Sequence, residues 1–227
     1  ETIQKERNLI RYRSRLMRDI NRSKNRIKSL LKYQGIEIPA QYAKNNWSQN
    51  FLTWIEQQAA KDELLADTLL LMLEQMKLLR QLLVKTERKL RELRNGKYAV
   101  KVKLATSVPG IGATTAMQFL LEAGDINRFK GFDALNDFIG FCPDTDSSGE
   151  TDRDRGITTR RHKQLRSALI ESAWQAIRVD PALMNSYQEL TKRMKGVHAI
   201  IRIARKLLRR LRAVLLTGIA YQKGVVA

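Results

Sequence analysis

The sequence contains a single cysteine, Cys142, and only two histidines, His162 and His198, in 227 residues. This inventory excludes a disulfide framework and any zinc site built from Cys and His. We interpret Cys142 as a small buried apolar residue rather than a reactive thiol.

Long apolar segments are also missing. No run approaches the roughly 18 apolar residues needed to span a bilayer, and no signal-peptide pattern opens the chain. We therefore expect a cytoplasmic protein without a membrane partner. The first residue is Glu1 rather than Met, so we also expect a further domain upstream.

Acidic residues are scarce relative to basic ones. The chain has 42 Lys and Arg against 23 Asp and Glu, a formal net charge of +19. A folded chain with this charge repels itself and is best understood beside a polyanion. Nucleic acid is the favoured polyanion, and an anionic membrane surface is the competing one.

The first half of the sequence predicts long helices. Residues 1–33 contain no Gly or Pro and form a helix-spaced seam, and Gly35 and Pro39 end it. The seam residues are Ile10, Met17, Ile20, Ile27 and Leu31. Ser48 is the expected N-cap of a short helix that carries Phe51, Leu52, Trp54 and Ile55.

A heptad pattern predicts one continuous helix over about 62–95. Its apolar positions alternate in spacing between 4 and 3, which is typical of a coiled coil. They are Leu65, Leu69, Met72, Met76, Leu79, Leu83, Thr86, Leu90 and Leu93. We expect this helix to pair antiparallel with residues 1–33 or with another copy of the chain, which would make the protein a homo-oligomer.

The pattern changes after Asn95–Gly96 to shorter helices and loops, and no stretch alternates convincingly enough to predict a sheet. The expected fold is all-α, with a coiled-coil arm over 1–97 and a compact helical domain over 98–227.

Residues 104–120 resemble the helix-hairpin-helix of DNA-binding proteins. Gly110 and Gly112 permit a tight turn, Ile111 between them can fill the core, and Ala116 is small enough for two helices to cross. The next helix then begins with unpaired N–H groups, which suit a DNA phosphate without base readout. The alternative is an ordinary corner between two helices.

Residues 141–159 are polar and predict an exposed loop, for which three interpretations compete. Asp144, Asp146, Ser148 and Gly149 match the first positions of a calcium-binding loop, but Arg155 falls where that loop needs a bidentate Glu. The second interpretation is a solvated linker.

The third interpretation rests on a family resemblance that covers nearly the whole chain. Its blocks are Val108–Gly112, Gly124–Phe129, Phe138–Phe141, Pro143, Ser147–Gly149, Gly156–Thr158, Leu165–Arg166, Ala204–Leu208 and, upstream, Lys24–Lys28 with Leu30, Leu31, Gly35, Ile36 and Pro39. Together they resemble the DEDD-type insertion-sequence transposases, the group that includes Piv/MooV-like invertases and the bridge-RNA-guided recombinases.

The resemblance implies that Ser148 is a nucleophile, with Ser147 as the alternate. It also implies an RNase-H-like domain upstream with four acids and Mg²⁺, and a structured guide RNA as a second partner beside double-stranded DNA. A serine hydroxyl that attacks a phosphodiester conserves its energy in a phosphoserine link, but it needs a base or a metal for activation. No cofactor is expected within these residues themselves.

One departure lies just after the loop. The family usually follows Ile-Thr with Lys-Arg-Gly-Asn, whereas this chain has Thr159-Arg160-Arg161-His162. The charge is retained, and the small and amide residues are replaced. We expect the basic residues around the serine to contact nucleic acid, namely Arg153, Arg155, Arg160, Arg161, Lys163 and Arg166.

Residues 191–224 contain ten Lys and Arg and no acid. Their apolar positions follow a helical period, which leaves Arg205 and Arg209 among the basic residues on the remaining surface. Such a helix could lie on a membrane, but a nucleic-acid backbone is the better partner.

Together these features predict a component of a DNA transposase that carries out serine-mediated strand cleavage and exchange, associated with the bacterial nucleoid and inactive without its upstream domain. The alternative is a non-catalytic nucleic-acid-binding scaffold derived from a transposase.

Overall fold

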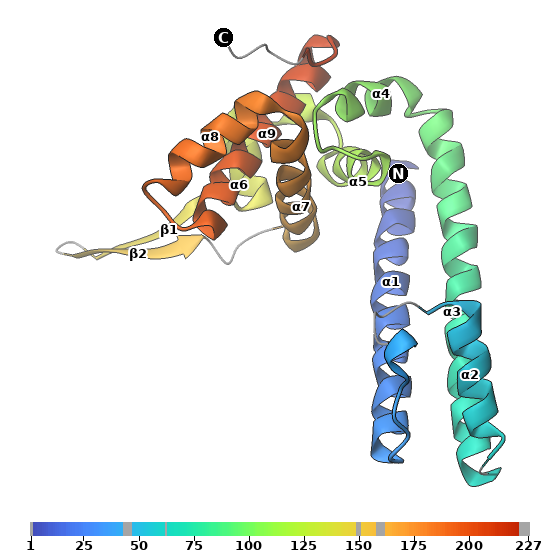
Figure 1. Ribbon diagram of the computed structural model, residues 1–227. Helices are drawn as coiled ribbons and strands as arrows, with labels where there is room; N and C mark the ends of the chain where they lie inside the picture. Colours follow the sequence, from blue (N-terminus) through green and yellow to red (C-terminus); the bar gives the residue numbers. More distant parts are fainter. Residues whose placement is uncertain (1, 43–46, 62, 149–150, 158–161, 223–227) are drawn as a thin grey trace. The chain divides into compact units, whose positions relative to one another are not determined.

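A computed structural model describes residues 2–42, 47–61, 63–148, 151–157 and 162–222 (Figure 1). For the strand residues 143–148 and 151–157 it describes the backbone. The chain divides into two compact units. Unit 1 comprises Glu1–Arg7 and Glu92–Ala227, and unit 2 comprises Asn8–Arg91.

Unit 2 is built from α1 (Thr2–Tyr33), α2 (Gln49–Ala59) and α3 (Glu63–Asn95), with a short 3₁₀ turn, η1 (Ala40–Tyr42), before α2. α1 and α3 run antiparallel, because Arg13 pairs with Glu87 at 2.8 Å near one end and Ile27 shares a core with Leu69 near the other. The Ser48 hydroxyl caps α2 as expected, accepting a hydrogen bond from the Phe51 N–H at 3.4 Å.

The prediction of one continuous helix over about 62–95 is confirmed by α3, which has no interruption. Five of its heptad positions are buried and the others described are half-buried; the buried ones are Leu65, Leu69, Met76, Thr86 and Leu90. Leu71 and Leu78, in contrast, are 66% and 54% exposed. The apolar surface of α3 is therefore wider than the core of unit 2 covers.

The seam predicted for α1 is wrong at one position. Met17 is 38% exposed, whereas Leu16 is 2% exposed and takes its place. Leu16, Ile20, Ile27 and Leu31 are spaced 4, 7 and 4 and so follow one face of a helix, while Met17 lies about 100° further round.

Unit 1 contains six further α-helices in its described residues: α4 (Ala99–Ser107), α5 (Ala113–Ala123), α6 (Phe132–Ile139), α7 (Lys163–Val179), α8 (Pro181–Thr191) and α9 (Gly196–Thr217), with a 3₁₀ turn, η2 (Ile126–Arg128). α7, α8 and α9 pack against one another, and α4, α5 and α6 complete the core around them. The predicted apolar face of α9 is buried, from Ile200 to Val214. The all-α class is confirmed.

The expectation of a loop over 141–159 without a sheet is wrong for the described residues. β1 (Pro143–Ser148) and β2 (Thr151–Ile157) pair antiparallel, and the hairpin extends away from the helices of unit 1 (Figure 1). The register places Ser147 opposite Asp152 and Ser148 opposite Thr151, with an irregularity between Pro143 and Thr145. An extended ladder is also not the wrapped conformation of a calcium-binding loop.

Candidate nucleic-acid interface

The turn between α4 and α5 holds the glycines of the expected hairpin. Gly110 has φ +81°, and a Cβ there would lie 2.2 Å from the Ser172 carbonyl oxygen and 2.8 Å from the Ala176 nitrogen. Glycine is therefore required at Gly110 so that the turn can pack directly on α7. Ile111 is 4% exposed and fills the core, and Ala116 is fully buried.

Gly112 differs from Gly110. It is exposed, has an ordinary φ of −79°, and a Cβ built on it would meet nothing within 4 Å. It is the N-cap of α5, and no side chain caps that helix. The first-turn N–H groups of α5 are thus the ones available to an anion, and Gly112 lies beside them.

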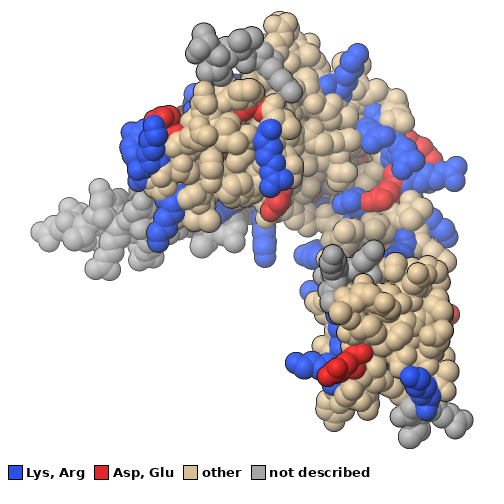
Figure 2. Space-filling model, in the orientation of Figure 1, with Lys and Arg blue, Asp and Glu red and all other residues tan. Residues whose placement is uncertain are grey.

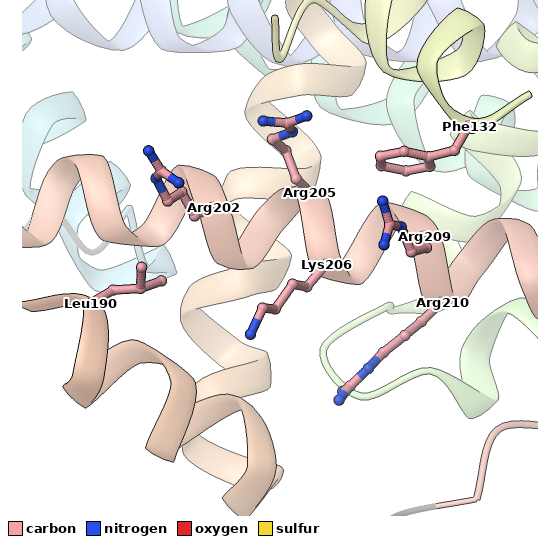
Figure 3. A pocket seen from close by; sticks show the side chains of 7 residues that line it. All are labelled: Phe132, Leu190, Arg202, Arg205, Lys206, Arg209 and Arg210. Atoms are coloured by element: carbon pink, nitrogen blue, oxygen red, sulfur yellow. The ribbon is translucent and has the colours of Figure 1, made fainter.

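α9 carries a groove lined by cations. It has a volume of about 380 Å³ and is bounded by Phe132, Leu190, Arg202, Arg205, Lys206, Arg209 and Arg210. Arg202, Arg205 and Arg209 project from one side of α9, with Arg209 toward Phe132, whereas Lys206 and Arg210 project from another (Figure 3). The Arg209 guanidinium lies 4.6 Å from the centroid of the Phe132 ring, which holds it in place.

Arg210 has a structural role within this groove. Its guanidinium lies 2.8 Å from the Asp180 carboxylate, which also accepts hydrogen bonds from the Tyr221 hydroxyl and the Leu183 N–H. Burial alone would raise the pKa of Asp180, but the Leu183 N–H, the charge of Arg210 and the Tyr221 hydroxyl outweigh it and hold that pKa below its usual range. Arg210 is therefore neutralised inside the protein.

Three cations of the groove remain for a ligand. Arg202, Arg205 and Arg209 have no ion pair with an acidic side chain in the described part of the chain. On the face drawn in Figure 2, Lys and Arg side chains also predominate over Asp and Glu. Lys206 differs, since its ammonium donates to the Ser186 hydroxyl at 2.9 Å.

The start of the β-hairpin lies beside this groove. The Cys142 thiol, one residue before β1, donates to the Asp137 carboxylate and accepts from the Asn136 amide at 3.3 Å. Burial raises the pKa of the Cys142 thiol to about 11, the Asp137 carboxylate adds to the rise, and the charge of Arg205 opposes it. Cys142 is half-buried rather than buried, and its thiol stays protonated at neutral pH. Since α6 packs against α9 and Phe132 of α6 lines the groove, the hairpin base that follows α6 lies near α9.

Arg166 fixes the same end of the hairpin. Its guanidinium donates to the Gly140 carbonyl oxygen at 3.1 Å, where Gly140 ends α6 in a left-handed conformation. The sequence predicted Arg166 as a nucleic-acid contact, whereas this bond joins α7 to the residue that leads into β1.

His162 joins α7 to α5. Its Nδ1 accepts from the Leu165 N–H at 3.2 Å and so caps α7, while its Nε2 lies 3.1 Å from the buried Glu122 carboxylate of α5. The Arg7 Nε lies 3.7 Å from the same carboxylate. His162 occupies the position of the asparagine in the family pattern. Since asparagine is a preferred N-cap, the replacement retains the cap and adds a contact to Glu122.

The remaining predicted site residues are placed as follows. Ser147 and Ser148 end β1, Arg153 and Arg155 lie in β2, and Lys163 is exposed at the first position of α7. Arg160 and Arg161 lie outside the described residues. Sequence reasoning missed Glu122 and Asp180; only Asp180 had a local indication, because Asp before Pro is typical of a helix N-cap.

Two negative findings apply to the described residues alone. In those ranges no helix is at once long enough and apolar enough to cross a bilayer. No group of three or more His, Cys, Asp or Glu side chains that could hold a metal ion occurs among the side chains described.

Comparison with known proteins bears on this unit. Residues 102–188 match the model of the transposase IS116/IS110/IS902 family. Over these residues the chain is similar to the transposases of that family. The matched segment includes the turn at Gly110, the β-hairpin and His162, and it ends before α9.

Individual relatives agree with the domain match. The chain is 32% identical over 123 residues to the 43.6 kDa protein of insertion element IS110 from Streptomyces coelicolor, covering 54% of this chain and 30% of that protein. It is 39% identical over 67 residues to the transposase for insertion sequence element IS1111A from Coxiella burnetii, covering 30% of this chain and 18% of that protein. The chain thus matches less than a third of the length of either relative.

Proposed function

We propose that this chain is the DNA-strand-transfer part of an insertion-sequence transposase, with Ser148 as nucleophile and the groove of α9 as the DNA-backbone site. The proposal rests on the position of the β-hairpin relative to α9. The hairpin lies within the segment that matches the transposase family, and α9 follows that segment. β1 ends at Ser148 and begins one residue after Cys142, shortly after the end of α6, and α6 packs against α9. A phosphodiester held by Arg202, Arg205 and Arg209 would therefore lie near the hairpin base.

The chemistry is a transesterification that conserves energy. The Ser148 Oγ forms a bond to phosphorus as the bond from phosphorus to a deoxyribose oxygen breaks, and that oxygen leaves as a hydroxyl after taking up a proton. Attack by another strand's hydroxyl reverses the step and frees the serine. Ser148 lies at the far end of β1, roughly 16 Å from Pro143 at about 3.3 Å per residue, so the three arginines would hold the DNA backbone at the hairpin base rather than the phosphate that Ser148 attacks. Mg²⁺, carried by an RNase-H-like domain that is not among these residues, would activate the hydroxyl.

The proposal includes two partners beyond duplex DNA. A structured guide RNA follows from the family resemblance and from the charge of +19. A second copy of the chain would cover the apolar surface that α3 leaves open at Leu71, Leu78 and Val84, of which Val84 is 67% exposed.

The decisive experiment restores the upstream domain, guide RNA and Mg²⁺ and traps a covalent protein–DNA adduct on a nicked duplex. Ser148→Ala abolishes the adduct and leaves DNA affinity nearly unchanged, whereas Ser147→Ala retains the adduct. The reverse pattern would assign the reaction to Ser147. If both variants still form the adduct, the serine mechanism is wrong, and the chain is a nucleic-acid-binding scaffold.

A further inference from the structure

Unit 2 contains a basic segment that the proposed function does not use. Between Ile20 and Tyr33, α1 carries five Lys and Arg and no acid. Lys24, Lys28 and Lys32 follow one another at intervals of 4 residues, which places them along one side of the helix. Each step advances about 6 Å along the axis, so that each ammonium can face a different charge of a ligand.

Arg80 of α3 joins this row at Trp47. The Arg80 guanidinium donates to the Trp47 carbonyl oxygen at 3.2 Å, and the Lys24 ammonium lies 5.9 Å from the centroid of the Trp47 ring. Trp47 itself is 6% exposed and belongs to the core of unit 2. A rigid core residue thus holds a cation from α1 near a cation from α3.

The charges at this place repel each other. The pKa of Lys24 is lowered, first by burial and then by the charges of Arg80 and Lys28. In the described part of unit 2, neither Lys24 nor Arg80 forms an ion pair with an acid. Bringing half-buried like charges together is unfavourable unless an anion joins them.

Other cations of the same unit are paired. Arg13 lies 2.8 Å from Glu87, and Lys77 lies 2.7 Å from Glu56. The lack of an acid near Lys24 and Arg80 is therefore a local feature of unit 2 and does not follow from its composition alone.

A groove borders the row of lysines. It has a volume of about 590 Å³ and is lined by Lys28, Lys32, Gly35, Ile36, Glu37 and Ile38. Its isoleucines offer apolar surface to a sugar, and Glu37 is the one acid in its lining. A chain of phosphates flanked by sugars fits both the row and the groove.

We propose that Lys24, Lys28, Lys32 and Arg80 form a second binding site for a nucleic-acid phosphodiester backbone, located entirely within unit 2. The site does not depend on the serine chemistry or on the groove of α9. Because its contacts are to phosphates, it holds nucleic acid without reading base sequence.

The test compares two charge-matched double variants of the whole chain. Lys24→Met/Arg80→Gln removes two charges from the site, and Met keeps an apolar stem over Trp47. Arg18→Gln/Lys85→Gln removes two charges from exposed positions elsewhere in unit 2. Binding to a labelled DNA duplex and to a labelled RNA hairpin is measured by fluorescence anisotropy over a salt series.

We expect the first variant to weaken binding and to make the slope of log affinity against log salt shallower, by about 0.9 for each duplex phosphate that the site no longer binds. The control variant changes the slope by less than half as much. A weaker affinity for RNA alone or for DNA alone identifies the ligand, and equal slopes for both variants on both ligands overturn the proposal.

The thermal midpoint of unfolding without nucleic acid separates an effect on binding from an effect on folding. Removal of repelling charges should not lower this midpoint for Lys24→Met alone. A lower midpoint for Lys24→Met with an unchanged slope would mean that Lys24 is only structural.

Discussion

The imidazole of His162 contacts two elements at once: its Nε2 lies 3.1 Å from the Glu122 carboxylate, and its Nδ1 caps α7 through the Leu165 N–H. Because Nδ1 accepts the Leu165 N–H, the nitrogen that can donate to the Glu122 carboxylate is Nε2. The residue that follows the β-hairpin in the described chain is thereby joined to α5, the helix that begins at Gly112.

This geometry predicts an order of stability among His162 variants. His162→Asn keeps a capping side chain but no longer reaches Glu122, whereas His162→Ala can do neither. We expect the free energy of unfolding to fall in the order wild type, Asn, Ala, with about 1 kcal/mol between the last two for the missing cap. Urea denaturation followed by circular dichroism gives these values. An Asn variant no more stable than the Ala variant would contradict the capping role.

Asp180 predicts a pH dependence of stability. Its pKa in the folded chain is depressed, so its contribution is complete above the ordinary Asp pKa of about 3.9 and is lost as pH falls through the folded value. Asp180→Asn leaves Arg210 without its partner and should cost roughly 3 kcal/mol at pH 7. The measurement is the urea midpoint between pH 7 and pH 2. The variant should lose less stability than the wild type over the acid range, and parallel curves would count against this assignment.

The two glycines of the turn predict different results. Gly110→Ala introduces a Cβ at 2.2 Å from the Ser172 carbonyl oxygen and requires φ +81°, so we expect stability to fall by at least about 2 kcal/mol. Gly112→Val meets no neighbour, and we expect it to cost only about 1 kcal/mol, because Val is a poorer N-cap than Gly. Urea denaturation of both variants measures the difference, and equal destabilisation of the two would contradict it.

Gly112→Val also tests the phosphate site at α5. The added side chain would stand beside the first-turn N–H groups, so affinity should fall alike for duplexes of every sequence. Affinity by anisotropy on several unrelated duplexes provides the readout. A decrease confined to one sequence, or no decrease at all, would argue against a backbone contact there.

Much of the helical fold could be predicted from the sequence. The heptad of α3 and the apolar face of α9 are long and regular, and both are confirmed. The seam of α1 has fewer apolar residues, so Met17 and Leu16 could not be distinguished by spacing over so long an interval. Tertiary packing decided between them.

The site was less accessible to sequence reasoning. The β-hairpin has almost no apolar residue to alternate, and its pairing comes from the backbone, which leaves no periodic pattern. The sequence shows His162 as a departure from the family pattern, but its partner Glu122 lies 40 residues earlier and is identified only by the fold. Arg166 and Arg210 each form a bond within the protein that the sequence alone does not indicate, to the Gly140 carbonyl oxygen and to the Asp180 carboxylate.

The basic side of α9 gives the last prediction. Arg202→Gln/Arg209→Gln removes two cations of the groove that have no acidic partner in the described chain, whereas Lys192→Gln/Arg193→Gln removes the same charge from the exposed end of α8. With six or more phosphates bound in all, wild-type affinity for a duplex should drop roughly 10³-fold between 50 and 200 mM salt. The groove variant should bind about two fewer phosphates, which makes the slope of log affinity against log salt shallower by about 1.8, and the control should stay close to wild type.

Competition with anionic vesicles addresses the membrane alternative, since a protein whose α9 binds DNA should prefer the duplex at equal phosphate concentration. If the affinity of the two variants falls equally, net charge rather than the groove governs binding, and the DNA site must be sought elsewhere in unit 1.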